Sequence, residues 1–333
     1  MLFRMALVLV ASLAPAALAW AQGTTAPRAL PDGFPNKPVT MTVPFAAGGP
    51  TDTVARLVAE AMARDLGSAV IVENVGGAGG TLGASRVASA RPDGYSILMH
   101  HIGMGTTPSL YRRLPYDPVN GFETVGLVTE VPMTVIARPS IEARDLVSLV
   151  ALMQREGTKL NLANAGVGAA SHLCGLLLQS AAKVQLTTVP YRGTAPAMTD
   201  LVGGTVDIMC DQTTNTTEQI KAGSVRAFAV TTRSRLAALP DLPTATEAGL
   251  PGFEVSVWHA LYTPRRTPDA INERLSKALQ AALSDPRVVA RFAELGTAPV
   301  DLAMATPAAH KTYWMADVAK WRPIIDAAGQ YAD

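Results

Sequence analysis

The amino-acid sequence predicts an α/β protein of two domains, and three observations support this prediction. Short apolar runs alternate with stretches in which apolar residues recur at helical spacing, which is the pattern of βαβ units and a mainly parallel sheet. Glycine-rich turns stand between several of these runs and the helical stretch that follows. The chain has 333 residues, which is enough for two domains of ordinary size even without its N-terminal segment.

The first residues have the features of a secretory signal peptide. Arg4 supplies a positive charge, residues 5–19 are apolar, and Ala19-Trp20-Ala21 offers a cleavage site of small residues. A transmembrane anchor is the competing interpretation, but the apolar run is shorter than the ~20 residues that a membrane-spanning helix needs. We therefore expect residues 1–21 to be removed on export, with cleavage near Ala21.

A leader and a first group of elements follow. Residues 22–37 are rich in proline and polar residues, which predicts a flexible leader. Apolar residues at i, i+3, i+4, i+7 and i+8 from Val54 form one face of a helix. A second helix opens near Thr81 and ends at about Ala90. Strands are predicted at residues 39–45, 69–75 and 95–101.

A second group of strands and helices occupies the middle of the chain, and further helices end it. Strands are predicted at residues 131–139, 160–166, 187–193, 206–211 and 225–232, and the segment 254–264 precedes the last helices. Helices are predicted near residues 145–155, 169–182, 194–203, 269–284, 286–295 and 307–328.

The final helices have no strands of their own to cover, so we expect them to pack on the first group. This makes the first domain discontinuous. We predict domain 1 at residues 38–128 and 254–333, and domain 2 at residues 129–253. The chain then crosses twice between the domains, near 124–138 and 250–262, and two such crossings form a hinge.

Charge and cysteine content exclude several classes of function. Removal of Arg4 with the signal peptide leaves 27 basic residues against 27 acidic ones, which argues against a nucleic-acid or anionic-membrane surface. We interpret Cys174 and Cys210 as small buried hydrophobic residues, with a disulfide between them as the alternative. Metal-binding spacings such as Cys-x-x-Cys and His-Glu-x-x-His do not occur, so we expect no metal and no cofactor.

Glycine-rich turns join a strand to a helix at four places, namely residues 45–53, 73–85, 163–173 and 190–198. Such turns place helix N-termini at the edge of the sheet where open α/β folds bind ligands. Unpaired N–H groups and the helix dipole favour an anion there, and glycine lets the backbone itself approach the ligand. The alternative is that these glycines only close tight turns.

The spacing of the glycines does not fit a phosphate or dinucleotide site. Leu82 and Ser171 stand where the last glycine of Gly-x-Gly-x-x-Gly would be, and no Gly-x-x-x-x-Gly-Lys-Ser/Thr occurs. One helix terminus contributes roughly 0.3 to 1 kcal/mol, up to ~2 when partly buried, whereas micromolar binding requires about 8 kcal/mol. Several turns from both domains must therefore act together, as in a clamp on a small carboxylate.

Individual polar residues have ordinary structural roles beside functional ones. Asp52 can cap the helix that begins beside it. Ser171 and His172 are adjacent on a helix and point about 100° apart, so they do not form a nucleophilic pair. Arg192 could pair with a second carboxylate or lie on the rim of the cleft. The polar stretch at residues 211–220 could bind a hydroxylated or amide-bearing acid, or begin a solvated helix.

Long ordered motifs resemble one family across residues 36–325. They include "VPFAAGGPTDTVARLVAEAM", "VENVGGAGGTLGASRVASARPDGYSIL", "VPYRGTAPAMTDLVGGTVDIM" and "LPTATEAGLPGFEVSVWHALYTP". The chain resembles the Bug (TctC-like) solute-binding proteins of tripartite tricarboxylate transporters. This resemblance implies a periplasmic protein with the type II periplasmic-binding-protein fold, in which two domains close like a trap on an organic acid between them.

The resemblance also implies which residues hold the ligand. Two loops of the first domain would bind a carboxylate through backbone amides and bridging waters, and segments of the second domain would complete the site. An aromatic residue is common in this family where Cys210 stands here, which leaves the size of the cleft open. The ligand-binding residues implied in this way are Phe45, Ala47, Gly48, Gly49, Thr51, Asp52, Gly77, Gly79, Gly80, His101, Thr106, Ala165, Gly168, Ser171, Tyr191, Arg192, Gly193 and Asp211.

The predicted function is therefore to bind a small mono-, di- or tricarboxylate and deliver it to the membrane permease subunits of a tripartite tricarboxylate transporter. We expect a monomer without catalytic residues. A ligand-sensing module for a membrane sensor kinase is one alternative, since the same clamp would serve either partner. An exported α/β enzyme is another, but Gly-x-Ser-x-Gly and paired acidic residues placed for acid–base chemistry do not occur.

Overall fold

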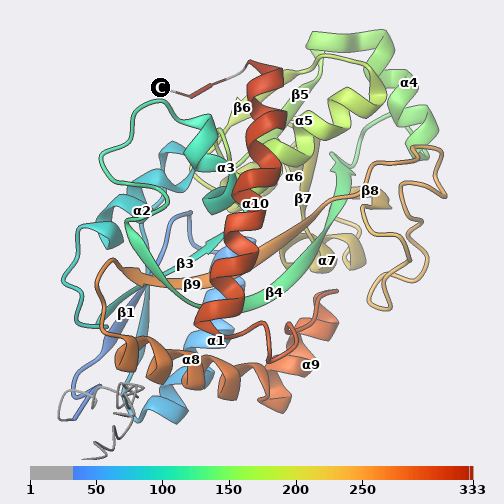
Figure 1. Cartoon of the computed structure of the whole chain (residues 1–333). Coiled ribbons are helices and arrows are strands. Elements are labelled where there is room, and N and C mark those ends of the chain that lie inside the picture. The colour runs from blue at the N-terminus through green and yellow to red at the C-terminus, as the bar shows by residue number, and fades with distance from the viewer. Residues whose placement is uncertain (1–32, 330, 333) are drawn as a thin grey trace, which may run out of the picture.

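The computed structural model describes residues 33–329, 331 and 332. The predicted signal peptide at residues 1–21 lies outside the described residues, and so does most of the leader predicted at 22–37. Figure 1 shows strands through the middle of the molecule, with helices packed around them. No helix in the described part of the chain has both the length and the hydropathy needed to span a membrane.

The first strand–helix units follow the predicted pattern. Helix α1 begins with Pro50, whose missing N–H group would have no partner in the first turn. It ends at Gly67, whose φ of 68° lies in the left-handed region that glycine adopts without strain. Val54, Val58 and Met62 on its predicted apolar face are buried. The elements are β1 (Val39–Val43), α1 (Pro50–Leu66), β2 (Val70–Asn74), η1 (Ala78–Gly80), α2 (Thr81–Ala88), β3 (Ser96–His101) and α3 (Gly103–Leu110).

A long strand leads from these units into a second group of elements. Helix α4 in this group begins with a capping box, in which the side chains and backbone of Asp145 and Ser148 satisfy each other's N–H groups. The elements are β4 (Phe122–Ala137), α4 (Leu146–Glu156), η2 (Gly157–Lys159), β5 (Asn161–Asn164), α5 (Ala170–Ala182), β6 (Thr187–Pro190), α6 (Thr194–Val202), β7 (Ile208–Gln212), α7 (Thr213–Lys221) and β8 (Arg226–Val230).

The chain then returns through one more strand and ends in three helices. The helix α8 packs against α1 and β4, whereas α10 packs against α3 and β4. Trp314 on α10 is fully buried, and its indole N–H donates to the carbonyl oxygen of Met104 on α3 over 2.8 Å. These elements are β9 (Ser256–Pro264), α8 (Asp269–Leu283), α9 (Pro286–Glu294) and α10 (Pro307–Ala328).

The strands form one sheet in the order β2-β1-β3-β9-β4-β7-β5-β6, and β8 also pairs with β4. Strand β9 is antiparallel to both β3 and β4, whereas β7 is antiparallel to β4 and parallel to β5. Strands β1 to β3 therefore run towards β5, β6 and β7, which run the opposite way. The C-terminal ends of the two parallel groups face each other, and open α/β sheets bind ligands at such ends.

The apolar core and one disulfide hold this arrangement. One buried cluster lies between α1, β1 and α8, and another joins β4, α5 and α10. Cys174 on α5 and Cys210 on β7 are fully buried and form a disulfide. Our preferred interpretation of two unpaired buried cysteines is therefore wrong, and the alternative holds.

Three features differ from the sequence-based predictions. The middle of the sheet is antiparallel, so "mainly parallel" describes only the two outer groups. Strand β4 begins at Phe122, well before the strand predicted at 131–139, because its first half pairs with β9. The sequence pattern does not predict helix α3, and it offers a solvated helix within residues 211–220 only as an alternative; α7 is a helix there, but four of its threonines are buried. The domain boundaries at 38–128, 129–253 and 254–333 stay a prediction.

Candidate ligand-binding cleft

Two loops from the opposing groups of strands touch each other directly. The N–H group of Ala46, after β1, donates to the carbonyl oxygen of Arg192, after β6, over 3.1 Å. A Cβ atom added at Gly193 would lie 2.7 Å from the nitrogen of Ala46, and one added at Gly76 would lie 2.8 Å from the carbonyl oxygen of Arg192. The structure is thus a closed form, in which glycines let backbone meet backbone.

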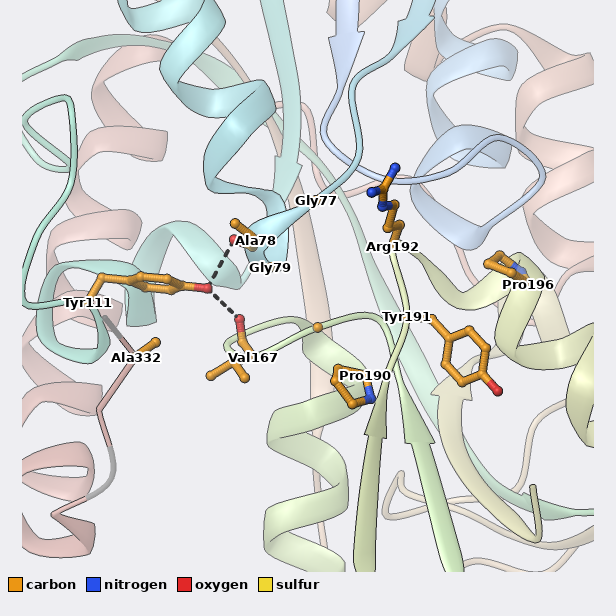
Figure 2. A pocket seen from close by; sticks show the side chains of 11 residues that line it. Gly77, Ala78, Gly79, Tyr111, Val167, Pro190, Tyr191, Arg192, Pro196 and Ala332 are labelled. Carbon is orange, nitrogen blue, oxygen red and sulfur yellow. Dashed lines mark hydrogen bonds between the residues drawn. The ribbon is translucent and has the colours of Figure 1, made fainter. Parts of the chain in front are cut away.

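Figure 2 shows a second contact between the two sides, at the mouth of the cleft. The hydroxyl group of Tyr111 lies 3.0 Å from the carbonyl oxygen of Ala78 and 2.9 Å from that of Val167. Gly79 has a φ of 61°, and a Cβ atom added to it would lie only 1.9 Å from the carbonyl oxygen of Val167. Gly166 packs on the backbone of Gly79 in the same way. Any larger residue at Gly79 would hold the mouth open.

A surface pocket of about 630 Å³ extends along this line of contact. The loop of residues 77–79 forms one of its sides, and the ends of β5 and β6 form the other. Both sides of the closed contact therefore contribute to its lining. Its lining residues are Gly77, Ala78, Gly79, Tyr111, Gly166, Val167, Pro190, Tyr191, Arg192, Pro196 and Ala332.

Asp52 fixes the position of the loop between β1 and α1. Its carboxylate accepts hydrogen bonds from the N–H group of Gly48, from Arg56 and from the side-chain amide of Asn74, each over 2.9 Å. Burial raises the pKa of Asp52, but these hydrogen bonds outweigh it and hold the pKa below its ordinary value. The N-cap of α1 is Gly49, so the prediction that Asp52 caps this helix is wrong. Asp52 lies in the first turn and ties the loop to β2.

The N-termini of two helices meet inside the closed contact. Gly49 precedes α1, and a Cβ atom added to it would lie 3.3 Å from the hydroxyl oxygen of Thr194 and 3.8 Å from the nitrogen of Ala195. Thr194 is the first residue of α6. The first-turn N–H groups of a helix have no partner within it and carry partial positive charge. Two such ends side by side create a position that favours an anion.

Aromatic and imidazole rings line the first-domain side. Phe45 stacks on His101, with ring centroids 4.6 Å apart, and His101 meets His259 edge to face. The Nε2 atom of His259 lies 3.3 Å from the hydroxyl oxygen of Thr51. Burial lowers the pKa of His101 to about 3 and that of His259 well below its ordinary value. These rings are neutral at pH 7 and supply packing and hydrogen bonds without charge.

Asp211 is the acidic group on the opposite side. It lies near the end of β7 and is fully buried, and burial raises its pKa to about 7 against the hydrogen bond from Asn215. Its Oδ2 atom accepts from the side-chain amide of Asn215 over 2.6 Å, whereas its Oδ1 atom has no partner. The hydroxyl group of Thr194 and the N–H group of Gln212 lie close enough to lower the pKa of Asp211, although the Thr194 hydroxyl does not reach hydrogen-bond geometry. Thr194 therefore lies beside both Asp211 and Gly49.

Several polar atoms on the elements that border the contact are buried without a hydrogen-bond partner. Buried polar groups are almost always paired, so a group of unpaired ones needs an explanation. Most of them lie at the C-terminal ends of strands or the starts of helices that face the first domain. They are Asn164 Nδ2, Thr194 Oγ1, Asp211 Oδ1, Gln212 Oε1, Thr214 Oγ1 and His259 Nδ1.

The predicted site residues are brought together in part. The loops around Phe45 to Asp52 and Gly77 to Gly80 do face the second group of strands. The N–H groups of Ala165 and Gly168 donate to the side chains of Ser171 and His172 in the first turn of α5. Thr106 is fully buried and donates to a carbonyl oxygen of its own helix, α3.

Two predicted side chains turn away from the interior. Arg192 is exposed on the rim, and Tyr191 donates to Asp200 over 2.6 Å (Figure 2 shows both side chains). Their backbone, and not their side chains, lies at the contact. Sequence reasoning missed Thr194 and His259. The first could have been noticed from its position after Gly193, because the residue after a glycine turn begins a helix.

The chain forms two lobes of α/β structure, which close on a cleft where their strand ends face each other. This arrangement defines a type II periplasmic-binding-protein fold. Comparisons with known proteins agree with this class. The chain matches the family "Tripartite tricarboxylate transporter family receptor" (TctC) over residues 54–330, and it belongs to that family. Proteins of the TctC family are periplasmic solute-binding proteins.

Similar proteins cover nearly the whole chain. A UPF0065 protein of Agrobacterium vitis is 54% identical over 90% of this chain and 86% of its own length. The structure of the periplasmic binding protein BugD is 50% identical, with a TM-score of 0.87 over 90% of this chain and 100% of that one. MatC from Rhodopseudomonas palustris, solved with bound malate, is 40% identical, with a TM-score of 0.84 over 88% and 100%.

One more solved structure adds a second bound acid. An R. palustris protein solved with adipate is 31% identical to this chain, with a TM-score of 0.84. The match covers 89% of this chain and 98% of that one.

Proposed function

We propose that this protein holds a small organic carboxylate in its closed cleft and delivers it to the membrane permease of a tripartite tricarboxylate transporter. The observation that carries the proposal is the meeting of the α1 and α6 N-termini at Gly49, beside buried polar atoms without partners. We infer that residues 1–21 direct export to the periplasm and are cleaved near Ala21. The protein is proposed to act as a monomer.

The charges around the cleft support an anion held by backbone groups. Among the buried residues in the described part of the chain there is no lysine or arginine, and the buried histidines near the cleft are neutral. A carboxylate there must take its hydrogen bonds from N–H and hydroxyl groups. Hydrogen bonds to a charged group contribute about 1.5 to 3 kcal/mol each, so a few of them account for micromolar binding.

The relatives support the same class of ligand. MatC was solved with malate and another R. palustris protein with adipate, and both acids are small dicarboxylates. We infer that this chain binds an acid of comparable size.

Thermal unfolding with a panel of organic acids tests the proposal. A ligand at 100 times its dissociation constant raises the free energy of unfolding by about 2.7 kcal/mol, because it binds only the folded protein. The panel contains mono-, di- and tricarboxylates, with their neutral amides and inorganic phosphate as comparisons. If phosphate or an amide raises the melting temperature and no carboxylate does, the proposal is wrong.

Gly79→Ala tests whether binding needs the closed form. The added Cβ atom would lie 1.9 Å from the carbonyl oxygen of Val167, so the mouth cannot close as observed. We expect binding of the tightest acid to weaken about tenfold or more. Gly67→Ala is the matched control, since Gly67 has a φ of 68° and nothing within 4 Å of an added Cβ atom. Equal effects of both variants on affinity would mean that backbone strain, and not closure, is responsible.

A further inference from the structure

The buried acid of the cleft bears on the chemical class of the ligand, provided that the proposed function holds. Asp211 is fully buried, and its Oδ1 atom has no hydrogen-bond partner. Its other oxygen accepts from Asn215, which is a neutral amide. The N–H group of Gln212 and the hydroxyl group of Thr194 also lower the pKa of Asp211, but burial outweighs them, so the desolvated charge is only partly compensated.

The surroundings of Asp211 connect it to the position where a ligand carboxylate would lie. Thr194 stands next to Asp211, and its hydroxyl oxygen is 3.3 Å from a Cβ atom added at Gly49. Helix α7 begins directly after β7 and packs against α1, so Thr214 lies on the same side. A ligand held at the N-termini of α1 and α6 would therefore have Asp211 within the reach of a small molecule.

The hydroxyl groups of Thr194 and Thr214 are buried without a partner and can donate or accept. Gln212 directly follows Asp211 on β7, where successive side chains point to opposite faces of the sheet. No buried lysine or arginine occurs in the described residues to balance a second negative charge. A second carboxylate placed here would meet the carboxyl group of Asp211, which disfavours it.

We propose that Asp211 selects organic acids that present a hydrogen-bond donor to it, an ammonium or hydroxyl group, in preference to acids of the same length without one. The donor would bind Asp211 Oδ1, with the Thr194 hydroxyl group as a further partner. An ammonium group would also balance the charge of the ionised Asp211. The raised pKa of about 7 agrees with a carboxyl group that gains a partner only when the ligand is bound.

Calorimetric titration of two matched sets of acids at pH 8 tests this. One set is succinate, L-malate and L-aspartate, and the other is butyrate, 4-hydroxybutyrate and 4-aminobutyrate. Within a set the acids differ in the donor, so hydroxyl and ammonium groups are separated. We expect the best donor-bearing acid to bind about tenfold or more tightly than its donorless counterpart. Tightest binding of succinate or butyrate would overturn the inference.

Asp211→Asn shows whether this residue is responsible. The preference for an ammonium should fall about tenfold or more, and that for a hydroxyl should fall less, because an amide oxygen still accepts. Asp317→Asn is the matched control: Asp317 is a buried acid on α10 whose carboxylate accepts from Trp258 over 3.0 Å, outside the cleft. It should leave the preference unchanged.

The outcomes separate this inference from the proposed function. Binding of acids without any preference for a donor would overturn the inference and leave the proposed function standing. Failure of every acid to bind would overturn both. An unchanged preference in a folded Asp211→Asn protein would assign the selection to another residue. If that variant does not fold, the donor preference of the unaltered protein still tests the inference, because that measurement needs no substitution.

Discussion

Asp52 shows how one side chain can serve both the fold and the cleft. The sequence suggests a helix cap, whereas the structure places this carboxylate in the first turn of α1, where it binds the N–H group of Gly48 and the side chains of Arg56 and Asn74. A negative charge in the first turn is favourable to the helix. The same carboxylate fixes the loop that touches the second domain, so loop geometry and helix stability depend on one residue.

We predict that Asp52→Ala lowers the free energy of unfolding by about 1 to 3 kcal/mol, because three donors lose their partner. Ligand affinity should fall as well, since the loop from Phe45 to Gly49 is no longer held. Urea denaturation and calorimetric titration measure the two effects. Asp117→Ala is the control, because Asp117 accepts from the N–H groups of Val119 and Asn120 in an exposed turn away from the cleft. It should lower stability without changing affinity.

At the scale of elements, the mouth of the cleft is closed by a side chain from α3's C-terminal end. Tyr111 reaches the loop of residues 77–79 on one side and Val167 on the other. A single hydroxyl hydrogen is shared between the two carbonyl oxygens, so the bond bridges the halves and is lost on opening.

We predict that Tyr111→Phe speeds ligand dissociation roughly threefold to tenfold, because a hydrogen bond made only in the closed form contributes about 0.5 to 1.5 kcal/mol. Stopped-flow measurement of ligand release, followed through tryptophan fluorescence, gives the rate. Tyr95→Phe removes the same atom from a surface pair with Asn36 and should not change it. Equal dissociation rates for wild type and Tyr111→Phe would contradict a role of this hydroxyl in closure.

The disulfide connects two elements that supply the second-domain side. Helix α5 carries Cys174 shortly after Ser171, and β7 carries Cys210 directly before Asp211. The sequence separation is 36 residues. Closing a loop of this size in the unfolded chain removes entropy equivalent to about 3 to 4 kcal/mol.

We therefore predict that replacing both cysteines by alanine lowers the free energy of unfolding by about 3 to 4 kcal/mol. Urea denaturation of the oxidised protein and of the double variant measures the difference. A reductant should destabilise the wild type and leave the double variant unchanged. The prediction is contradicted if a reductant that can reach the unfolded chain leaves the free energy of unfolding of the wild type unchanged.

At the scale of the whole molecule, buried histidines make the protein sensitive to acid. Burial lowers the pKa of His101 and His310 to about 3, and those of His100 and His259 well below 6.5. A histidine whose pKa is lower in the folded state contributes stability above pH 6.5, and that stability is lost as the pH falls from 6.5 towards 3. Asp211 acts in the opposite sense, because its raised pKa favours the folded state as the pH falls from 7 to 3.8.

We predict a net loss of stability between pH 6.5 and 4, because four buried histidines outweigh the two buried acids whose pKa is raised, Asp211 and Asp317. His310 provides the sharpest test, since neither of its ring nitrogens has a partner and it packs against Tyr262 with ring centroids 4.6 Å apart. His310→Phe should keep the packing and flatten the decline, seen in urea midpoints from pH 8 to 4. A decline as steep as in the wild type would rule out His310 as a contributor.

Elements with strong local patterns are predictable, and those stabilised by distant contacts are not. The face of α1 from Val54 to Met62 has helical spacing, so the helix follows from the sequence. The segments that form α3 and α7 are rich in glycine or threonine, which are poor helix formers. Tertiary packing overrides this: α10 covers α3, and the hydroxyl groups of Thr213 and Thr217 donate to carbonyl oxygens beyond α9.

The sequence by itself determined the α/β class, the glycine-rich turns and the anion-favouring helix starts, because these depend on neighbours within a few residues along the chain. The tertiary structure alone decided which turns meet. It brought Ala46 to Arg192 and Gly49 to Thr194, and it left Asp211 buried with one oxygen unpaired. Burial and hydrogen-bond pairing depend on contacts between segments far apart in the chain, so no local sequence pattern predicts them.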